Sequence, residues 1–248
     1  MVPLDPGAPR HAVQPRVLAI IPAYNEAASL PAVLHDLREH VPCSDVVVIN
    51  DGSIDATSAV ARAHGAWVID LPINLGIGGA VQTGLIFAHR GGYDIAFQLD
   101  GDGQHLAAEL PKIIDPVLAN RFDAVIGSRF LDVRSYRVPW NRRLGIQVLN
   151  FVCSVLSGTR VTDATSGFRA YNRTAIALLA RMYPQDYPEP EVIITLRKHR
   201  LRVGEAPVRM QPRLAGHSSI TPIRSTYYMA KVTLALIIHA LGPAKELP

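Results

Sequence analysis

The sequence predicts an α/β fold with a Rossmann-like, doubly wound and mostly parallel sheet that carries helices on both faces. Two observations support this prediction. Short apolar runs alternate with segments of helical periodicity over the first hundred residues, and this βαβαβαβ pattern is typical of a parallel sheet. The length of 248 residues and the hydrophobic content of 48% are sufficient for one large domain with a sizeable core.

Four strands are expected in the first half of the chain, and polar residues follow each of them. The apolar runs cover 16–22, 45–50, 66–70 and 93–99. Helical patterns lie between them at 25–40, at 55–64 with Asp55 as N-cap, and at 79–89. Ligands of such sheets bind beyond the carboxyl ends of the strands, so the polar residues at these ends form the candidate site.

The second half of the chain is less regular. Strands are expected at 122–126 and 202–210, and a loop with a strand at 162–171. Helices are expected up to about Leu156 and at 173–182, 189–199 and 222–241. We divide the chain into a disordered leader at 1–15, a folded domain at 16–220, and a C-terminal amphipathic, apolar helix and tail at 221–248. The leader has four prolines and no apolar signal segment.

Charge and cysteine usage exclude few classes of protein. The formal net charge of +4 is small and scattered, which fits an anionic substrate or membrane surface and gives no reason to expect nucleic acid. Cys43 and Cys153 lie in no CxxC pair, so we expect two reduced thiols in a cytoplasmic protein. No segment approaches the ~20 apolar residues that a membrane span requires.

The strongest chemical signal is the segment Gln98-Leu-Asp-Gly-Asp-Gly-Gln-His105. Asp100 and Asp102 follow a buried strand, and alternate residues of an extended chain point the same way. Two carboxylates, the Gln104 amide oxygen and water suit Mg²⁺ or Mn²⁺. Such an ion stabilises a nucleoside diphosphate as a leaving group. The alternative is an acidic turn without a metal, and we expect His105 to have only a secondary, hydrogen-bonding role.

Two other strand ends carry polar segments. Asp51 either accepts a hydrogen bond from a base or ribose or serves as a turn residue, and we expect Asp55 to be structural. The segment Asn74-Leu-Gly-Ile-Gly-Gly79 resembles a phosphate cradle at a helix N-terminus. It matches neither the dinucleotide-binding pattern nor the P-loop pattern, so it indicates neither of those sites.

Arginines after the strand at 122–126 are candidates for binding a phosphate group. Arg129 directly follows that strand on the side where ligands bind. Arg142 and Arg143 begin an apolar helix, and for them a solvated surface position is an equal alternative. The sequence therefore places cations near the acidic pair, with Arg129 as the first candidate.

Together these residues resemble glycosyltransferase family 2, and within it the polyprenyl-phosphate glycosyltransferases of the dolichol-phosphate mannose synthase type. The similarity extends over about residues 16–220. The matching segments, in the family's order, are Ile21-Pro-Ala-Tyr-Asn-Glu26, Asp51-Gly-Ser53, Asn74–Gly79, Gln98–His105, Gly127-Ser-Arg129 and Asp163-Ala-Thr-Ser-Gly-Phe-Arg169. The resemblance implies a single GT-A domain over 16–220, an inverting mechanism and a UDP- or GDP-sugar as donor.

The resemblance also implies roles for individual residues. The metal would be held by Asp100, Asp102 and Gln104. The donor would contact Pro22, Ala23, Tyr24, Glu26, Asp51, Gly78, Asp100, Arg213 and Ser218, with Arg213 and Ser218 on a loop that closes over it. Arg129 with Arg142 or Arg143 would bind an acceptor phosphate, and the catalytic residues would be Asp102, Arg129 and Asp163.

Three positions depart from the family pattern. Asn50 stands where these proteins often have an Asp, which weakens the expected contact with the base. Ser219 stands where the mannose synthases often have a Lys, so one phosphate contact is in doubt. The segment Tyr187-Pro-Glu-Pro-Glu191 has no close counterpart in the mannose synthases and resembles bacterial family members that use other sugars.

The acceptor decides whether the reaction needs a general base. A hydroxyl acceptor needs one, whereas a phosphate monoester is already anionic near neutral pH and needs cations to hold it. We therefore predict transfer to a polyprenyl phosphate. The alternative is a saccharide or other hydroxyl acceptor in cell-envelope polysaccharide synthesis, with Asp163 or Glu191 as base and Glu189 as a further candidate.

The C-terminal helical pattern bears on where the enzyme works. Its apolar residues, with Lys231 among them, would suit the interface of a membrane, and packing on the protein's own core is an equal alternative. We predict a peripheral protein at the cytoplasmic face of the membrane. A small membrane-spanning partner protein is suggested by analogy to the mannose synthases.

Three other classes of protein fit the sequence less well. A nucleotidyltransferase would usually have a glycine- and lysine-rich motif where this chain has Pro22–Glu26. A dinucleotide-dependent oxidoreductase would need GxGxxG after the first strand. A non-catalytic binding module would not need Asp100, Asp102 and Gln104 together. The sequence does not specify the sugar.

Overall fold

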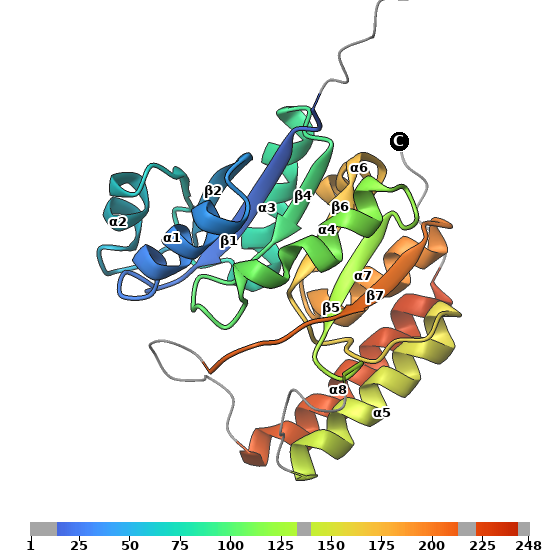
Figure 1. The fold of residues 1–248 in the computed structure, drawn as a ribbon. Coiled ribbons are helices and arrows are strands. Elements are labelled where there is room, and N and C mark those ends of the chain that lie inside the picture. The colour runs from blue at the N-terminus through green and yellow to red at the C-terminus, as the bar shows by residue number, and fades with distance from the viewer. Residues whose placement is uncertain (1–13, 133–139, 213–221, 243–248) are drawn as a thin grey trace, which may run out of the picture.

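The computed structural model describes residues 14–132, 140–212 and 222–242; for 140–144 and 222–230 it describes the helical backbone alone. Seven strands form one sheet in the order β3-β2-β1-β4-β6-β5-β7 (Figure 1). The strands are β1 (Val17–Ala23), β2 (Ser44–Asn50), β3 (Trp67–Asp70), β4 (Ile95–Gln98), β5 (Ala124–Ser128), β6 (Arg169–Asn172) and β7 (Val203–Pro207). The helices are α1 (Leu30–His40), α2 (Thr57–Ala63), α3 (Gly76–Arg90), the short 3₁₀ helix η1 (Ala107–Glu109), α4 (Leu110–Leu118), α5 (Trp140–Ser157), α6 (Arg173–Met182), α7 (Pro188–Lys198) and α8 (Pro222–Leu241).

The prediction of a doubly wound, mostly parallel sheet is confirmed. β1 pairs in parallel with β2 on one side and with β4 on the other, and β2 pairs in parallel with β3. The chain therefore builds outward from β1 to β3 and then returns to the other side of β1. A crevice forms at such a reversal of strand order, beyond the carboxyl ends of the two central strands. In this protein those ends are Ala23 and Gln98.

Within this sheet, β6 runs against its neighbours. It pairs antiparallel with β4 and with β5, whereas β5 and β7 are parallel. The sequence predicted a strand here but not its direction. Gln98, at the end of β4, lies opposite Arg169, at the start of β6. The loop that leads into β6 therefore lies at the carboxyl edge of β4, next to the acidic segment.

Two helices differ from the sequence prediction. α1 begins at Leu30 rather than near Asn25, because Asn25 has a positive φ of 57° and a turn precedes the helix. α4 was not predicted, although its buried residues Leu110, Ile113, Ile114 and Val117 have helical spacing. Pro116 inside this helix argues against it at the sequence level, since proline removes a backbone donor.

The sheet is covered by helices on both faces, as predicted. Leu18 and Ile20 of β1 belong to a core that includes side chains of α3, α6 and α7. Ala19 and Ile21 belong to a second core with side chains of α1, α2 and α4. This alternation follows from the two-residue period of a strand, and it explains why the buried strands are apolar throughout.

α5 and α8 pack side by side as an outer layer on α7 (Figure 1). Val232 and Leu236 of α8 are buried in the first core, whereas Leu234, Ile238 and Leu241 are exposed. The helix therefore packs on the protein's own core, as one alternative expected, and it also leaves an apolar face exposed; a position at a membrane interface stays a prediction. Among the described helices, none is both long enough and apolar enough to cross a membrane.

Candidate active site

The acidic segment after β4 lines a cavity at the reversal of strand order. Asp100 and Asp102 both face this cavity, whose volume is about 220 Å³. The other lining residues come from the end of β1, the start of α3, the loop before β6 and the start of α7; they are Pro22, Glu26, Ile77, Gly101, Thr165, Gly167 and Glu189. The fold thus brings the acidic pair together with two of the residues expected at the donor, Pro22 and Glu26.

The acidic loop is held in shape by its own backbone and by His105. The Gln104 amide donates to Asp102 Oδ1 over 2.9 Å, and the Asp100 amide donates to Nδ1 of His105 over 3.0 Å. Since Nδ1 accepts, the neutral imidazole carries its hydrogen on Nε2, which lies 3.7 Å from Asp100 Oδ2. His105 is buried and stacks on Phe168 with the ring centroids 4.8 Å apart. His105 therefore supports the loop through hydrogen bonds.

A second, smaller cavity adjoins the first and contains Arg129. It has a volume of about 120 Å³ and is lined by Asp100, Gln104, His105, Arg129, Thr165, Ser166, Gly167 and Met210. Asp100, Thr165 and Gly167 line both cavities, so they form a common wall. The predicted metal ligand Gln104 faces the smaller cavity, and Asp102 faces the larger one.

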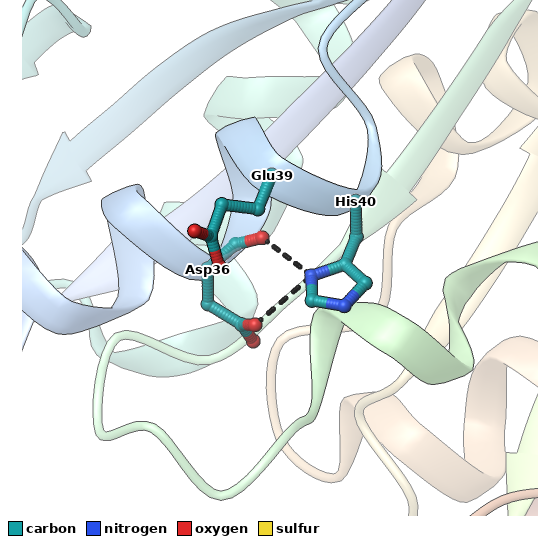
Figure 2. A group of neighbouring side chains, drawn as sticks. All are labelled: Asp36, Glu39 and His40. Carbon is teal, nitrogen blue, oxygen red and sulfur yellow. Dashed lines mark hydrogen bonds and ion pairs between the residues drawn. The ribbon is translucent and has the colours of Figure 1, made fainter.

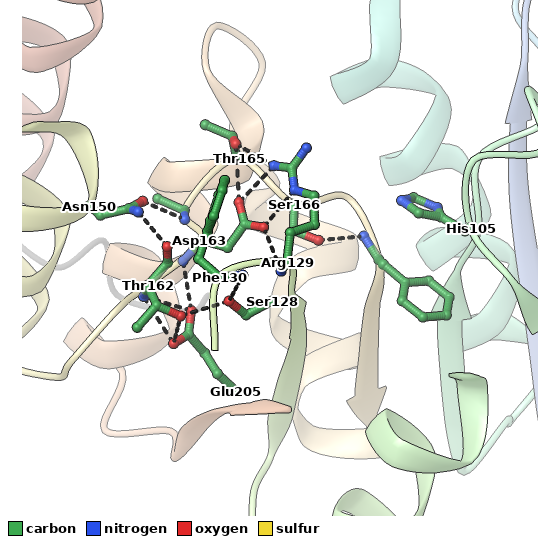
Figure 3. Close-up of polar contacts among 12 residues, drawn as sticks. His105, Ser128, Arg129, Phe130, Asn150, Thr162, Asp163, Thr165, Ser166 and Glu205 are labelled. Atoms are coloured by element: carbon green, nitrogen blue, oxygen red, sulfur yellow. Dashed lines mark hydrogen bonds and ion pairs between the residues drawn. The ribbon is translucent and has the colours of Figure 1, made fainter. Parts of the chain in front are cut away.

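Arg129 is fixed by a buried carboxylate (Figure 3). Its Nε and Nη2 donate to the two oxygens of Asp163 over 2.7 Å each, and its backbone amide donates to Asp163 Oδ2 over 3.0 Å. Nη2 also donates to Thr165 Oγ1 over 2.8 Å. Asp163 is fully buried, so its carboxylate serves to orient the guanidinium, and an acceptor hydroxyl has no direct access to it.

Residues predicted to bind the donor also tie the strand ends together. Asp51 is buried, and its two carboxylate oxygens accept from the amides of Leu75 and Gly76 at the start of α3, over 2.7 and 2.9 Å. The helix N-terminus that resembles a phosphate cradle thus already holds an anion, the chain's own Asp51. Gly78 packs against backbone, because a Cβ there would lie 3.0 Å from the Pro184 carbonyl oxygen. The described contacts give both residues structural roles, and their predicted contacts with a donor stay predictions.

The remaining donor candidates differ in exposure. Pro22 and Ala23 are buried at the end of β1, whereas the Tyr24 side chain is 49% exposed beside them. Asp55 does not stand at the N-cap position of α2, which is Ala56, but its Oδ1 accepts from the Thr57 amide over 2.9 Å in the first turn. The structural role expected for Asp55 is therefore confirmed, although Asp55 lies one residue before the N-cap position.

A buried arginine behind the acidic pair was not predicted as a site residue. Arg169 is 1% exposed, and its Nη1 and the Tyr171 hydroxyl have no hydrogen-bond partner among the described residues. Burial raises the pKa of Glu189, and the charge of Arg169 opposes that shift. Glu189 shares the larger cavity with Asp100, so the buried cation offsets part of the negative charge there. The sequence shows that Arg169 ends the segment Ser166-Gly-Phe-Arg169, but it does not show that the side chain of Arg169 is buried.

Glu191 lies away from the acidic pair. It lines a separate cavity of about 550 Å³ between α7 and α8, together with Lys198 and His239. Burial and the neighbouring Asp186 raise the pKa of Glu191 to about 7. Because Glu191 faces this cavity and neither of the two described above, we do not expect it to act as the base at the sugar.

Four predicted site residues are outside what the structure describes. Arg213 and Ser218 lie in the stretch 213–221, outside the described residues, as does Ser219. Arg142 and Arg143 lie in the first turns of α5, where only the backbone is described. Their predicted roles stay predictions.

A second acidic group, on α1, supports the chain after the acidic loop (Figure 2). Asp36, Glu39 and His40 have ligand atoms within 4.8 Å of one another. The group is engaged internally, however: His40 Nδ1 lies 3.1 Å from Asp36 Oδ1, and Asp36 Oδ2 accepts from the Ala107 amide over 2.8 Å. Asp36 thus attaches η1 to α1, and we assign the group a structural role.

A mostly parallel sheet with an acidic pair at its reversal of strand order is the arrangement expected of a nucleotide-dependent transferase, and comparison with known proteins identifies the family. The model of glycosyl transferase family 2 matches residues 18–179. The chain therefore belongs to this family and is a glycosyltransferase, which confirms the resemblance found in the sequence.

Two similar proteins are named as enzymes that transfer a sugar to a polyprenyl phosphate. The undecaprenyl-phosphate mannosyltransferase of Micrococcus luteus is 33% identical over 83% of this chain and 88% of its own length. The UDP-N-acetylglucosamine–dolichyl-phosphate N-acetylglucosaminyltransferase of Methanococcus voltae is 30% identical over 78% of this chain and 84% of its own length. The chain is related to polyprenyl-phosphate sugar transferases, and the relatives differ in the sugar they transfer.

Solved structures confirm the GT-A fold. The glucosyl-3-phosphoglycerate synthase of Mycobacterium tuberculosis, in complex with Mn²⁺, UDP and phosphoglyceric acid, aligns with a TM-score of 0.72. The alignment covers 94% of this chain and 81% of that one, at 19% identity. At this identity the likeness concerns the fold alone.

Proposed function

We propose that the protein transfers a sugar from a UDP- or GDP-sugar to a polyprenyl phosphate, with inversion at the anomeric carbon. The observation that carries this proposal is the pair of adjoining cavities with a common wall at Asp100. One cavity contains the acidic pair, and the other contains a cation fixed by a buried carboxylate. An electrophile bound in the first would lie next to an anionic nucleophile bound in the second.

The acidic pair fits a hard divalent cation. Asp100 and Asp102 supply carboxylate oxygens to one cavity, and Gln104 is an amide on the same short loop. Mg²⁺ and Mn²⁺ accept such oxygen ligands and usually complete their coordination with phosphate oxygens and water. When bound, the ion would neutralise charge on the departing nucleoside diphosphate. The protein itself keeps the two carboxylates in place through the Gln104 amide and His105.

In the described part of the chain, the acceptor side has a cation and no accessible base of the predicted kind. Arg129 is 14% exposed at its side chain and lines the smaller cavity, so its guanidinium is a cation toward which an anionic group could bind. Asp163, the predicted base for a hydroxyl acceptor, is buried behind Arg129 with both oxygens occupied. A phosphate monoester fits this arrangement better than a hydroxyl, because it brings its own negative charge and needs no proton removed.

The exposed faces of α5 and α8 support a reaction at a membrane surface. Phe151 and Val155 on α5 are 70% and 62% exposed, and Ile238 and Leu241 on α8 are 63% and 81% exposed. Neither helix contains an acidic residue, and their charged residues are all cationic. Helices that carry exposed apolar side chains and only cationic charges suit the headgroup region of an anionic leaflet, where a polyprenyl phosphate lies.

A direct transfer assay tests the proposal. The purified full chain is given a panel of labelled UDP- and GDP-sugars with Mn²⁺, and product formation is measured with polyprenyl phosphate in detergent or vesicles. We expect sugar on the lipid from one donor and none on free saccharides. Transfer to a saccharide hydroxyl without any transfer to polyprenyl phosphate would overturn the proposal and favour Glu189, which lines the larger cavity with the acidic pair, as a base.

A further inference from the structure

The guanidinium of Arg129 is oriented by residues distant in the sequence. Asp163, its bidentate partner, lies 34 residues further along the chain, in the loop that leads into β6. Asp163 is itself held at its backbone, because its amide donates to Glu205 Oε1 of β7 over 3.0 Å. The position of Arg129 therefore depends on how this loop is attached to β7.

Glu205 is the main attachment of the loop. Both of its carboxylate oxygens accept from the Thr162 amide over 2.9 Å, and Oε2 also accepts from Thr162 Oγ1 over 2.8 Å (Figure 3). With the Asp163 amide, three donor groups of two adjacent residues converge on one carboxylate. Burial raises the pKa of Glu205, and the hydrogen bonds from Thr162 and Asp163 oppose the rise. A carboxylate desolvated in this way is tolerated because these donors compensate it.

The same carboxylate sets the direction of a hydrogen-bond chain on β5. Thr162 has one hydroxyl hydrogen, which it donates to Glu205, so its oxygen must accept from Ser128 Oγ over 2.7 Å. Ser128 Oγ in turn accepts from the Phe130 amide over 3.2 Å. This chain of hydrogen bonds therefore supports the backbone on either side of Arg129 and ends at the Glu205 carboxyl group.

Asn150 on α5 holds the same loop through a second set of hydrogen bonds. Its Oδ1 accepts from the Ala164 amide over 2.9 Å, and its Nδ2 donates to the Thr162 carbonyl oxygen. Residues 162–164 are thus attached to both a strand and a helix, and neither attachment faces the two cavities of the site.

We propose that Glu205 is a positioning residue that sets Arg129 for the acceptor phosphate by holding Thr162 and Asp163. This inference rests on the proposed function, since it assigns the phosphate to Arg129. Glu205 does not line either cavity, so it acts on the acceptor through the loop alone. The substitution Glu205→Gln places an amide NH₂ group among the N–H donors of Thr162 and Asp163, and we expect it to loosen the loop.

The test compares Glu205→Gln with a matched control at the other end of the same strands. Asp123, a buried carboxylate, accepts hydrogen bonds from Arg202 and Asn172 and so joins β5 to β7 and β6 away from the site. We expect Glu205→Gln to raise KM for polyprenyl phosphate about tenfold, with KM for the nucleotide sugar within about twofold of wild type. Asp123→Asn should lower the thermal midpoint but leave both KM values unchanged.

The outcomes separate the inference from the proposed function. If the wild type transfers sugar to polyprenyl phosphate and Glu205→Gln leaves acceptor KM unchanged, or raises donor KM equally, Glu205 is only structural and the inference fails. If the wild type transfers no sugar to polyprenyl phosphate, the proposed function fails and the positioning role with it. Should Glu205→Gln not fold, Asn150→Asp loosens the same loop from α5, and the same rise in acceptor KM is expected.

Discussion

The proposed donor side, around Asp100 and Asp102, and the proposed acceptor side, around Arg129, are built in different ways. At the acidic pair, contacts are short in sequence: Gln104 bonds to Asp102, and the whole acidic segment follows one strand. On the acceptor side, Arg129 depends on Asp163 and the Asp163 loop on Glu205, across 34 and 42 residues. A short motif can thus define the acidic pair, whereas the surroundings of Arg129 need the folded arrangement of three strands. Substitutions on the two sides should therefore impair different parts of the reaction.

The largest expected effect is on the donor side. Asp102→Asn removes one carboxylate from the acidic pair, and we expect transfer to fall by about 10³-fold, because a metal contributes several kcal/mol of charge stabilisation to a leaving diphosphate. The Gln104 amide can still donate to the side-chain oxygen of the substituted residue, so the loop should keep its shape. Mn²⁺-dependent donor hydrolysis and transfer are measured together, with the thermal midpoint as a check on folding. Equal activity in wild type and variant would contradict a role for Asp102 in holding a metal at the donor.

The next largest effect is on the acceptor side. Arg129→Ala should reduce kcat/KM for polyprenyl phosphate by about 10²-fold, while the affinity for UDP with Mn²⁺ stays near wild type, because a charge-assisted contact is lost on one side only. Arg202 provides the control. It forms a similar bidentate pair with Asp123, with both hydrogen bonds at 3.0 Å, at the other end of β5 and β7. If Arg202→Ala reduces acceptor use as strongly, the effect comes from the sheet and not from the site.

The same difference explains what the sequence could predict. Most strand and helix positions followed from periodicity, α4 and the start of α1 excepted, and the acidic pair was visible from its place after a buried strand. The family comparison confirms the family prediction. The antiparallel direction of β6 was not predicted, because the residue pattern of a single short strand does not show in which direction it pairs. Glu205 was not singled out, because a lone Glu in a strand gives no signal until its partners Thr162 and Asp163 are known.

The exposed face of α5 provides a further test of the acceptor side. Phe151→Asp on α5 should weaken binding to vesicles that contain anionic phospholipid by about tenfold, since a mostly exposed Phe contributes roughly 1.5–3 kcal/mol when it is buried. Transfer to a water-soluble, short-chain prenyl phosphate should stay unchanged. Leu118→Asp on α4 is the control, because Leu118 is also exposed but lies on a different helix. Vesicle flotation measures both, and equal loss in the two variants would show that added negative charge, not position, is responsible.

The smallest effect concerns Glu191, and it tests whether the acceptor side uses a base there. Its pKa in the folded protein is about 7, against 4.5 for an exposed Glu, so ionisation is disfavoured by folding. Below pH 4.5 the group is protonated in both the folded and the unfolded state and has no effect. Between pH 4.5 and 7 the destabilisation grows, and above pH 7 it is constant at an order of 1–3 kcal/mol. Glu191→Gln should therefore increase the free energy of unfolding at about pH 8, with a smaller gain at about pH 5.

Urea unfolding at the two pH values measures this difference, and the transfer assay is run on the same samples. If the Glu191→Gln enzyme is more stable at the higher pH and keeps its transfer activity, Glu191 destabilises the fold and has no role in the reaction. Loss of transfer with an unchanged fold would instead make Glu191 functional from the cavity between α7 and α8, which it shares with Lys198 and His239. The acceptor side would then extend beyond the two adjoining cavities, and the comparison between a local donor site and a distributed acceptor site would become more pronounced.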